Sequence, residues 1–251
     1  HAKMAMVVRR EGGKIKRYCH LGTGNYHART ARMYTDFGLL TRHPALCQDV
    51  NDVFMQITGL GNAGEHDYLW QSPFTLHPNV IRAIEKETER ARAGEPARIV
   101  AKMNALLEPK VIAALYEASQ AGVQIDLIIR AVCALRPGIP GISENIRVRS
   151  IIGRFLEHHR VFYFWNGGQE DIYLSSADWM DRNFFRRIET SFPILDEKLK
   201  KRVINEGLTP YLKDSLQAWE MQPDGSYRKR PRRGRGFSSQ DYLLKLLAAK
   251  G

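Results

Sequence analysis

Two stretches of the chain repeat one order of residue types. The first begins with His1-Ala2-Lys3 and reaches Gly22-Thr23-Gly24-Asn25; the second begins with His158-His159-Arg160 and reaches Ser175-Ser176-Ala177-Asp178. Each copy thus has a histidine, a basic residue two positions later, a predicted hairpin, and a hydroxyl residue followed two positions on by Asn or Asp. Side chains two residues apart in a strand project from the same face, so each copy can present an imidazole and a cation together.

These groups suit attack on a phosphorus atom. Imidazole titrates near neutral pH, so one histidine can act as a nucleophile and another as an acid or an electrostatic partner. Cations and polar donors can hold the oxygens of a phosphoryl group during its transfer. We therefore predict a phosphoryl-transfer site that draws on both copies, with the candidate residues His1, Lys3, Asn25, His158 and Arg160.

Metal binding is a weaker interpretation of the same histidines. His158 and His159 are adjacent and point to opposite faces of a strand, so they cannot easily share an ion. The three cysteines (Cys19, Cys47 and Cys133) form neither a CxxC pair nor a disulfide framework. We expect no metal ligands in this chain, and a reducing cytoplasm as its location.

The elements that must position these groups alternate between strands and helices. Turn residues and apolar patterning predict strands over residues 7–9, 14–21, 33–41, 99–103, 123–129, 161–165 and 171–174. Helices are predicted over residues 44–57, 79–93, 109–121, 195–206 and 240–249. This alternation predicts an α/β fold with mixed sheets flanked by helices. The glycine-containing loop over residues 59–64 divides a partial first domain, residues 1–67, from a complete second domain, residues 68–251.

Composition narrows the class of protein and of partner. The chain has 251 residues, 43% of them hydrophobic, and a formal net charge of +11, which excludes a disordered or collagen-like chain. No apolar run approaches the roughly 20 residues that a membrane-spanning helix needs. The positive charge is concentrated in two segments: residues 228–235 hold six cations, and residues 130–160 hold six arginines against two acids. Both predict an anionic partner, and the second is the better candidate for phosphate.

Several motifs resemble one family. The chain is similar to type 1 polyphosphate kinases, a branch of the phospholipase D superfamily, from residue 1 to about residue 212 in the stretches HAK (1–3), HLGTGNY (20–26), TARMYTD (30–36), RPG (136–138), SENIR (143–147), FLEH (155–158) and YLSSADWM (173–180). The resemblance implies phospholipase D-like sheets. We also expect a C-terminal fragment of a longer protein, because residues 4–8 already have the pattern of a strand. Ala131 stands where the family leads us to expect glycine.

The resemblance also implies an activity and residue roles. Such enzymes transfer the terminal phosphate of ATP reversibly to polyphosphate through a phosphohistidine, which corresponds to His1, and His158 corresponds to a second histidine that acts as an acid or assists transfer. The remaining matched positions are the nucleotide-contacting Tyr34 and Arg130 and the acidic Asp36 and Glu189. Mg²⁺ is expected as a cofactor whose ligands precede the first residue. ATP, ADP and polyphosphate are the expected partners, in a homo-oligomer that is cytoplasmic or peripheral to the inner membrane.

Two other functions remain open at this stage. A phosphodiesterase or phosphatidyl transferase of the wider superfamily would carry Lys in place of Arg160 and an Asp shortly after each Lys, but residues 4–10 contain no acid. A non-catalytic module that binds nucleic acid would exploit the basic segment over residues 228–235, but it leaves the repeated histidines unexplained. Aromatic residues that could stack on bases are sparse there.

Overall fold

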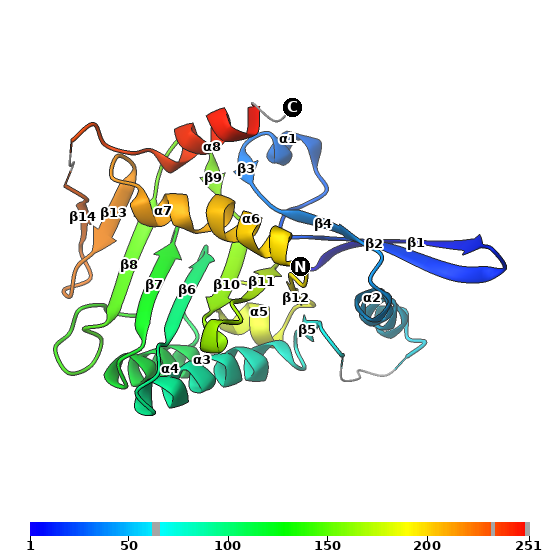
Figure 1. Cartoon of the computed structure of the whole chain (residues 1–251), viewed down its shortest axis with the longest axis horizontal. Helices are drawn as coiled ribbons and strands as arrows, with labels where there is room; N and C mark the ends of the chain where they lie inside the picture. The colour runs from blue at the N-terminus through cyan, green and yellow to red at the C-terminus, as the bar shows by residue number, and fades with distance from the viewer. Residues whose placement is uncertain (62–65, 232–233, 249–251) are drawn as a thin grey trace.

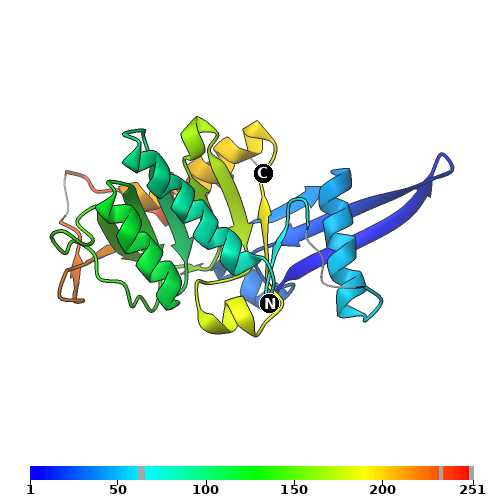
Figure 2. The ribbon, with the colours of Figure 1, turned by 90° about the horizontal axis from the view of Figure 1, so that it is seen from below.

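The computed structural model describes residues 1–61, 66–231 and 234–248 of the chain. A large sheet with helices on both faces forms one part, and a small sheet with a protruding hairpin forms the other (Figures 1 and 2). Within the described residues, no helix has both the length and the apolar character needed to cross a membrane.

The small sheet contains the first copy of the repeat. Its antiparallel order is β1-β2-β4, with β1 at Lys3–Glu11, β2 at Lys14–Gly22 and β4 at Gly38–Thr41. The β1–β2 hairpin turns at Gly12 and Gly13, which both have positive φ, and it extends away from the large sheet (Figure 1). Helix α2 (Pro44–Ile57) follows and buries one apolar stripe.

The large sheet contains the second copy. Its nine strands run in the order β14-β13-β8-β7-β6-β10-β11-β12-β5. Their bounds are β5 Trp70–Gln71, β6 Arg98–Met103, β7 Gln124–Ile129, β8 Ile146–Ile151, β10 Arg160–Phe164, β11 Asp171–Ser175, β12 Thr190–Pro193, β13 Ala218–Met221 and β14 Tyr227–Lys229. Strands β6, β7 and β8 are mutually parallel and the remaining neighbours are antiparallel, so the predicted mixed sheet is confirmed.

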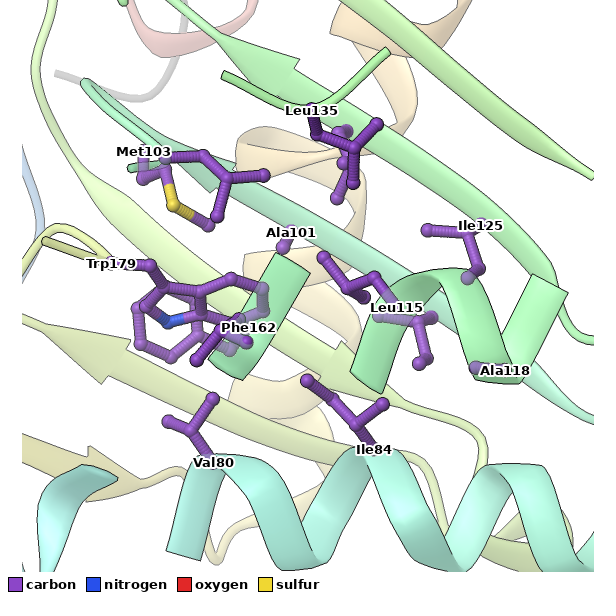
Figure 3. Packing of buried hydrophobic residues seen from close by; sticks show 14 of the residues in the cluster. Val80, Ile84, Ala101, Met103, Leu115, Ala118, Ile125, Leu135, Phe162 and Trp179 are labelled. Carbon is purple, nitrogen blue, oxygen red and sulfur yellow. The ribbon is translucent and has the colours of Figure 1, made fainter. Parts of the chain in front are cut away.

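Helices cover both faces of this sheet because its central strands are apolar on both sides. In β6, Ile99, Ala101 and Met103 pack with α3 (Leu76–Arg92) and α4 (Pro109–Gln120), where Figure 3 shows Val80 and Ile84 facing the strands. The alternate residue Val100 belongs to the core on the other face, which α6 (Glu197–Gly207) and α7 (Thr209–Lys213) cover. Helix α8 (Ser239–Ala248) lies beyond the strand ends, near β9 (Figure 1). The shorter elements are α1 (Ala28–Ala31), α5 (Asp181–Phe185) and the 3₁₀ turn η1 (Asn166–Gly168).

One predicted strand is wrong in a way that matters for the site. The stretch 33–41 divides into β3 (Tyr34–Thr35) and β4, and β3 leaves the small sheet to pair in parallel with β9 (Leu156–Glu157). The break falls at Asp36 and Phe37, where the Phe37 N–H donates to the Thr23 hydroxyl at 3.0 Å. This two-stranded sheet brings the two copies of the repeat together.

Other element predictions need smaller corrections. Helix α3 begins at Leu76, three residues earlier than predicted, because Pro78 is tolerated in a first helical turn. Helix α6 begins at Glu197, since the Asp196 carboxylate caps it by accepting from two main-chain N–H groups. Strand β8 was not predicted, because two arginines interrupt its apolar pattern. Half of the predicted boundary loop, residues 62–64, lies outside the described residues.

Candidate functional site

The second histidine of the repeat is fixed on both ring nitrogens. His158 Nδ1 lies 2.8 and 3.0 Å from the two Asp36 carboxylate oxygens, and its Nε2 lies 3.1 Å from Nη1 of Arg160. A guanidinium only donates, so Nε2 accepts and the proton on Nδ1 donates to Asp36. The Tyr34 ring lies beside the imidazole with a centroid separation of 4.9 Å. His158 is thereby held in one tautomer and one orientation.

Asp36 is in turn held by the loop that follows β2. Thr23 donates its hydroxyl to Asp36 Oδ1 at 2.7 Å, and a Cβ on Gly24 would overlap the same carboxylate. Burial favours the neutral carboxyl, but the hydrogen bonds and charge from His158 and the bond from Thr23 outweigh it, so the pKa of Asp36 is lowered. The carboxylate therefore stays ionised while it orients the imidazole.

Arg160 belongs to a chain of polar contacts that ends at Arg130. Asp178 accepts from Arg160 Nε at 3.2 Å and Nη2 at 3.1 Å, and it also accepts from the main-chain N–H of Asn104 at 2.7 Å. The Asn104 side-chain oxygen accepts from Arg130 Nε at 2.9 Å. Asn104 and Arg130 directly follow the parallel strands β6 and β7, and open α/β sheets bind ligands at such strand ends.

His159 lies in the opposite environment, as the alternation of side chains along a strand predicts. It is 3% exposed, and its Nε2 donates to the Gly207 carbonyl at 3.3 Å. Burial, reinforced by the charge of Lys102, lowers its pKa to about 3. This histidine is therefore neutral and structural, and only His158 of the adjacent pair belongs to the site.

A buried ion pair lies behind the β3–β9 junction. Lys102 Nζ is 2.9 Å from Glu157 Oε2, and both side chains are 2% exposed. Burial opposes ionisation of Glu157, but Lys102 overcomes it and the pKa of this carboxyl falls to about 2. Glu157 also accepts from Thr35 Oγ1 at 3.0 Å and from Gln240 Nε2 at 2.7 Å, so strand β6, strand β3 and helix α8 all meet at this carboxylate.

The first copy of the repeat joins the site through Lys3 and Glu189. Glu189 is fully buried and accepts from Ser176 Oγ at 2.5 Å, from Asn183 Nδ2 at 2.7 Å and from the backbone nitrogen of His1 at 3.1 Å. Burial lowers the pKa of the Lys3 amine, while the charges of Glu189 and Asp36 raise it. The Lys3 amine is thus within electrostatic reach of both half-sites.

One predicted site residue, Asn25, makes no hydrogen bond to the other candidate residues through its side-chain amide in the described part of the chain. Asn25 is exposed. Its main-chain carbonyl accepts from the His27 N–H at 2.9 Å, which places it at the entry to α1.

The basic segment over residues 130–160 contributes less than predicted. Arg147 and Arg149 lie on β8 and pair with Asp126 at 3.0 and 3.7 Å. Because this acid comes from outside the segment, the net charge of +4 in the sequence is not a free phosphate surface. Of its six arginines, the contacts described above include Arg130 and Arg160 in the site.

The basic segment over residues 228–235 lies apart from these contacts. Arg228 and Lys229 are on the edge strand β14. Arg230 donates to the Leu212 and Asp214 carbonyls at 3.0 Å each and pairs with Glu220 at 3.3 Å. Arg232 and Arg233 lie outside the described residues.

Sequence reasoning did not single out Asn104 or Thr23. Asn104 had an available signal, because it follows one predicted parallel strand as Arg130 follows the next. Thr23 was noted in the repeat, but its bond to Asp36 depends on the departure of β3 from the small sheet, which no local pattern indicates.

The two acidic side chains assigned to the site, Asp36 and Glu189, are engaged by protein groups. No group of three or more His, Cys, Asp or Glu side chains that could hold a metal occurs among the described residues. Asp36 is occupied by His158 and Thr23, and Glu189 by Ser176 and Asn183. We therefore derive no step from a metal held by this chain.

Comparison with known proteins decides the family. The model named polyphosphate kinase C-terminal domain 1 matches residues 1–63, and the model named polyphosphate kinase C-terminal domain 2 matches residues 69–240. The chain belongs to the polyphosphate kinase family. It is 64% identical to a polyphosphate kinase of Paraburkholderia phytofirmans over 98% of this chain and 36% of that protein. It is 66% identical to one of Burkholderia vietnamiensis over 92% of this chain and 34% of that protein.

A solved polyphosphate kinase supports the same assignment. The crystal structure of the enzyme from Porphyromonas gingivalis superposes with a TM-score of 0.92 at 34% identity, over 99% of this chain and 39% of that one. The chain spans about a third of the length of the curated polyphosphate kinases that it matches. The resemblance drawn from the sequence motifs is confirmed.

Proposed function

We propose that this chain carries catalytic groups of an ATP–polyphosphate phosphotransferase. His1 is the nucleophile: its imidazole attacks the terminal phosphorus of ATP, the bond to the β-phosphate oxygen breaks and ADP leaves. The phosphoryl group then passes to the terminal oxygen of polyphosphate, and the histidine is regenerated. The observation that carries the proposal is the meeting of the two repeat copies, with Asp36 of the first orienting His158 of the second at 2.8 Å.

The surrounding groups fit this reaction. Arg130 is fixed through Nε by an amide oxygen, so the end of its guanidinium can receive phosphate oxygens. Arg160 is paired with Asp178, and its Nη1 bonds His158. An arriving phosphate would draw Arg160 away from His158 Nε2 and favour a proton there. His158 could then act as the acid, with Asp36 supporting its positive charge.

Several further features are part of the proposal. ATP would arrive as its Mg²⁺ complex, since magnesium is commonly held by substrate phosphates and few protein ligands. Residues 1–67 form the C-terminal part of a first catalytic domain and residues 68–251 form a second one, a division supported by the separate family matches. The active protein is a cytoplasmic or peripheral inner-membrane homo-oligomer with ATP, ADP and polyphosphate as partners, and nucleic acid is not a partner.

A labelling experiment tests the proposed function. The chain is prepared alone and joined to the upstream part of the P. phytofirmans enzyme, and each is incubated with γ-labelled ATP and Mg²⁺. We expect the joined protein to gain acid-labile, base-stable label and to form polyphosphate, and the chain alone to show little activity. His1→Ala should remove both the label and the product, while His27→Ala, at the cap of α1, should keep both.

Three results would count against it. Label that survives His1→Ala would exclude His1 as the nucleophile. A joined protein that folds but gains no label and forms no polyphosphate would contradict the kinase function. Full turnover by the chain alone would contradict the dependence on an upstream part.

A further inference from the structure

Asn104 occupies the junction between the two arginines of the site. It is 6% exposed and directly follows β6, beside the end of β7. Its main chain is fixed on both sides: its N–H donates to Asp178 Oδ1 at 2.7 Å, and its carbonyl accepts from the Ala131 N–H at 2.8 Å. With its backbone immobilised, its side-chain oxygen has a defined place, 2.9 Å from Nε of Arg130.

The same junction leads to the other arginine. Asp178, which holds the Asn104 N–H, also receives Nε and Nη2 of Arg160 at 3.2 and 3.1 Å. Arg160 and Asp178 are each 6% exposed, so this part of the network is shielded from water. The spacing between the two guanidinium groups is therefore set by one short path, from Arg130 through Asn104 and Asp178 to Arg160.

We propose that Asn104 is a positioning residue that orients Arg130 toward the phosphate groups of the substrate, at a fixed distance from the buried pair of Arg160 and Asp178. This inference rests on the proposed function and names a residue that the family motifs did not indicate. An amide oxygen fixes Nε of Arg130 without neutralising the guanidinium, whose remaining N–H groups can form paired bonds to phosphate oxygens. A carboxylate at position 104 would hold Arg130 equally well but would compete with phosphate for its charge.

Two substitutions of similar size separate the effect of Arg130 orientation from the effect of charge. Asn104→Leu removes the acceptor and frees Arg130, while Asn104→Asp keeps the acceptor and adds a competing charge. In the joined protein, we expect Asn104→Leu to raise KM for ATP about tenfold, in line with the loss of one hydrogen bond to a charged group. Asn104→Asp should raise KM at least as much, with a stronger dependence on salt.

A double-mutant cycle distinguishes positioning from general damage. In an Arg130→Ala background, Asn104→Leu should cost almost nothing further, because there is no guanidinium left to orient. The matched control is Asn145→Leu: Asn145 is a half-buried amide at the other end of β7, where it bonds the Ser119 carbonyl at 2.9 Å, and its loss should leave KM unchanged. Thermal unfolding of each variant shows whether it is folded.

A binding measurement decides the matter even if the joined protein proves inactive. Inorganic tripolyphosphate is titrated calorimetrically into the 251-residue chain and its variants. We expect Asn104→Leu and Arg130→Ala each to weaken binding about tenfold, and the double variant to equal Arg130→Ala alone. The positioning role is refuted if the two losses of binding affinity add in the double variant, or if folded Asn104→Leu binds tripolyphosphate and turns over ATP as the parent does. If the parent is inactive but the binding affinities follow the expected pattern, only the proposed function is contradicted.

Discussion

The two copies of the histidine pattern have the same order of residue types but different surroundings. His158 is bonded at both ring nitrogens, to Asp36 and Arg160. In the first copy, the contacts run through the main chain: the backbone nitrogen of His1 donates to the Glu189 carboxylate, and the Ala2 N–H donates to the Ile188 carbonyl. The same order of residue types is thus held by different contacts in the two copies. The contrast supports a division of work in which one histidine carries the phosphoryl group and the other is fixed to act on it.

Removal of the fixed histidine is the strongest way to break this contrast. We expect His158→Ala to lower kcat of the joined protein by about 10³-fold, the middle of the range for a positioned acid or base. His43→Ala, which alters the cap of α2, serves as the control. Steady-state polyphosphate synthesis measures the effect, and a loss below about fivefold would mean that His158 has no such role.

A second test targets the support behind the fixed half-site. Lys102→Met leaves the buried Glu157 carboxylate without its ion-pair partner, so the free energy of unfolding should fall by about 3 kcal/mol. Urea unfolding of the chain measures it, with the exposed Lys110→Met as a control. The double variant Lys102→Met/Glu157→Leu should recover part of the lost free energy of unfolding. An unchanged urea midpoint in Lys102→Met would show that the ion pair does not stabilise this region.

The neighbouring histidine gives a pH test of the same region. The pKa of His159 is about 3 in the folded chain against an ordinary value of 6.5, so below pH 6.5 the unfolded chain binds a proton that the folded chain does not. Stability should therefore fall as pH drops from 6.5 towards 3, by at most about 1.4 kcal/mol per pH unit from this residue.

Substitution of His159 isolates this contribution. His159→Gln retains a donor for the Gly207 carbonyl and removes the titration, so stability between pH 6.5 and 4.5 should fall by roughly 2 kcal/mol less than in the parent. Glu157 adds its own loss below pH 4.5, because its folded pKa is about 2 and its stabilisation disappears as it is protonated. If the free energies of unfolding of the parent and of His159→Gln change equally with pH between 6.5 and 4.5, His159 is not the group that titrates.

The smallest effect on activity is expected for Thr23, the residue of the first copy that bonds Asp36. Thr23→Val keeps the side-chain shape but removes the hydroxyl that bonds Asp36 at 2.7 Å, so the imidazole should be less well oriented. We expect kcat to fall about tenfold with KM little changed. Thr30→Val, in the short helix α1, is the matched control, and equal effects of the two variants would show that Thr23 acts only through the fold.

The sequence could predict the large sheet better than the site. The buried strands β6 and β7, the hairpin of β10 and β11, and Arg130 at a strand end follow from local patterns. The contact between Asp36 and His158 does not, because it joins residues 122 positions apart through a strand of two residues on each side. Pairing of such short segments depends on tertiary contacts rather than on their own residues.

The sequence also does not show which arginines and lysines are free to bind an anion. Arg147 and Arg149 face Asp126 across neighbouring strands, and Lys102 faces Glu157, so formal charges close in sequence are neutralised by partners far from them. Arg130 differs because a neutral amide orients it, whereas Arg160 is paired with Asp178. Only the fold separates arginines that are available to a phosphate from those already paired.

The most direct measurement maps the phosphoryl group itself. The joined protein is labelled with ATP, digested under alkaline conditions that preserve phosphohistidine, and sequenced by tandem mass spectrometry. The account predicts a phosphoryl group on His1 and an unmodified His158, both in the parent and, more slowly, in His158→Ala. A phosphoryl group found on His158, with His1 unmodified, would contradict the division in which His1 carries the phosphoryl group and His158 acts on it.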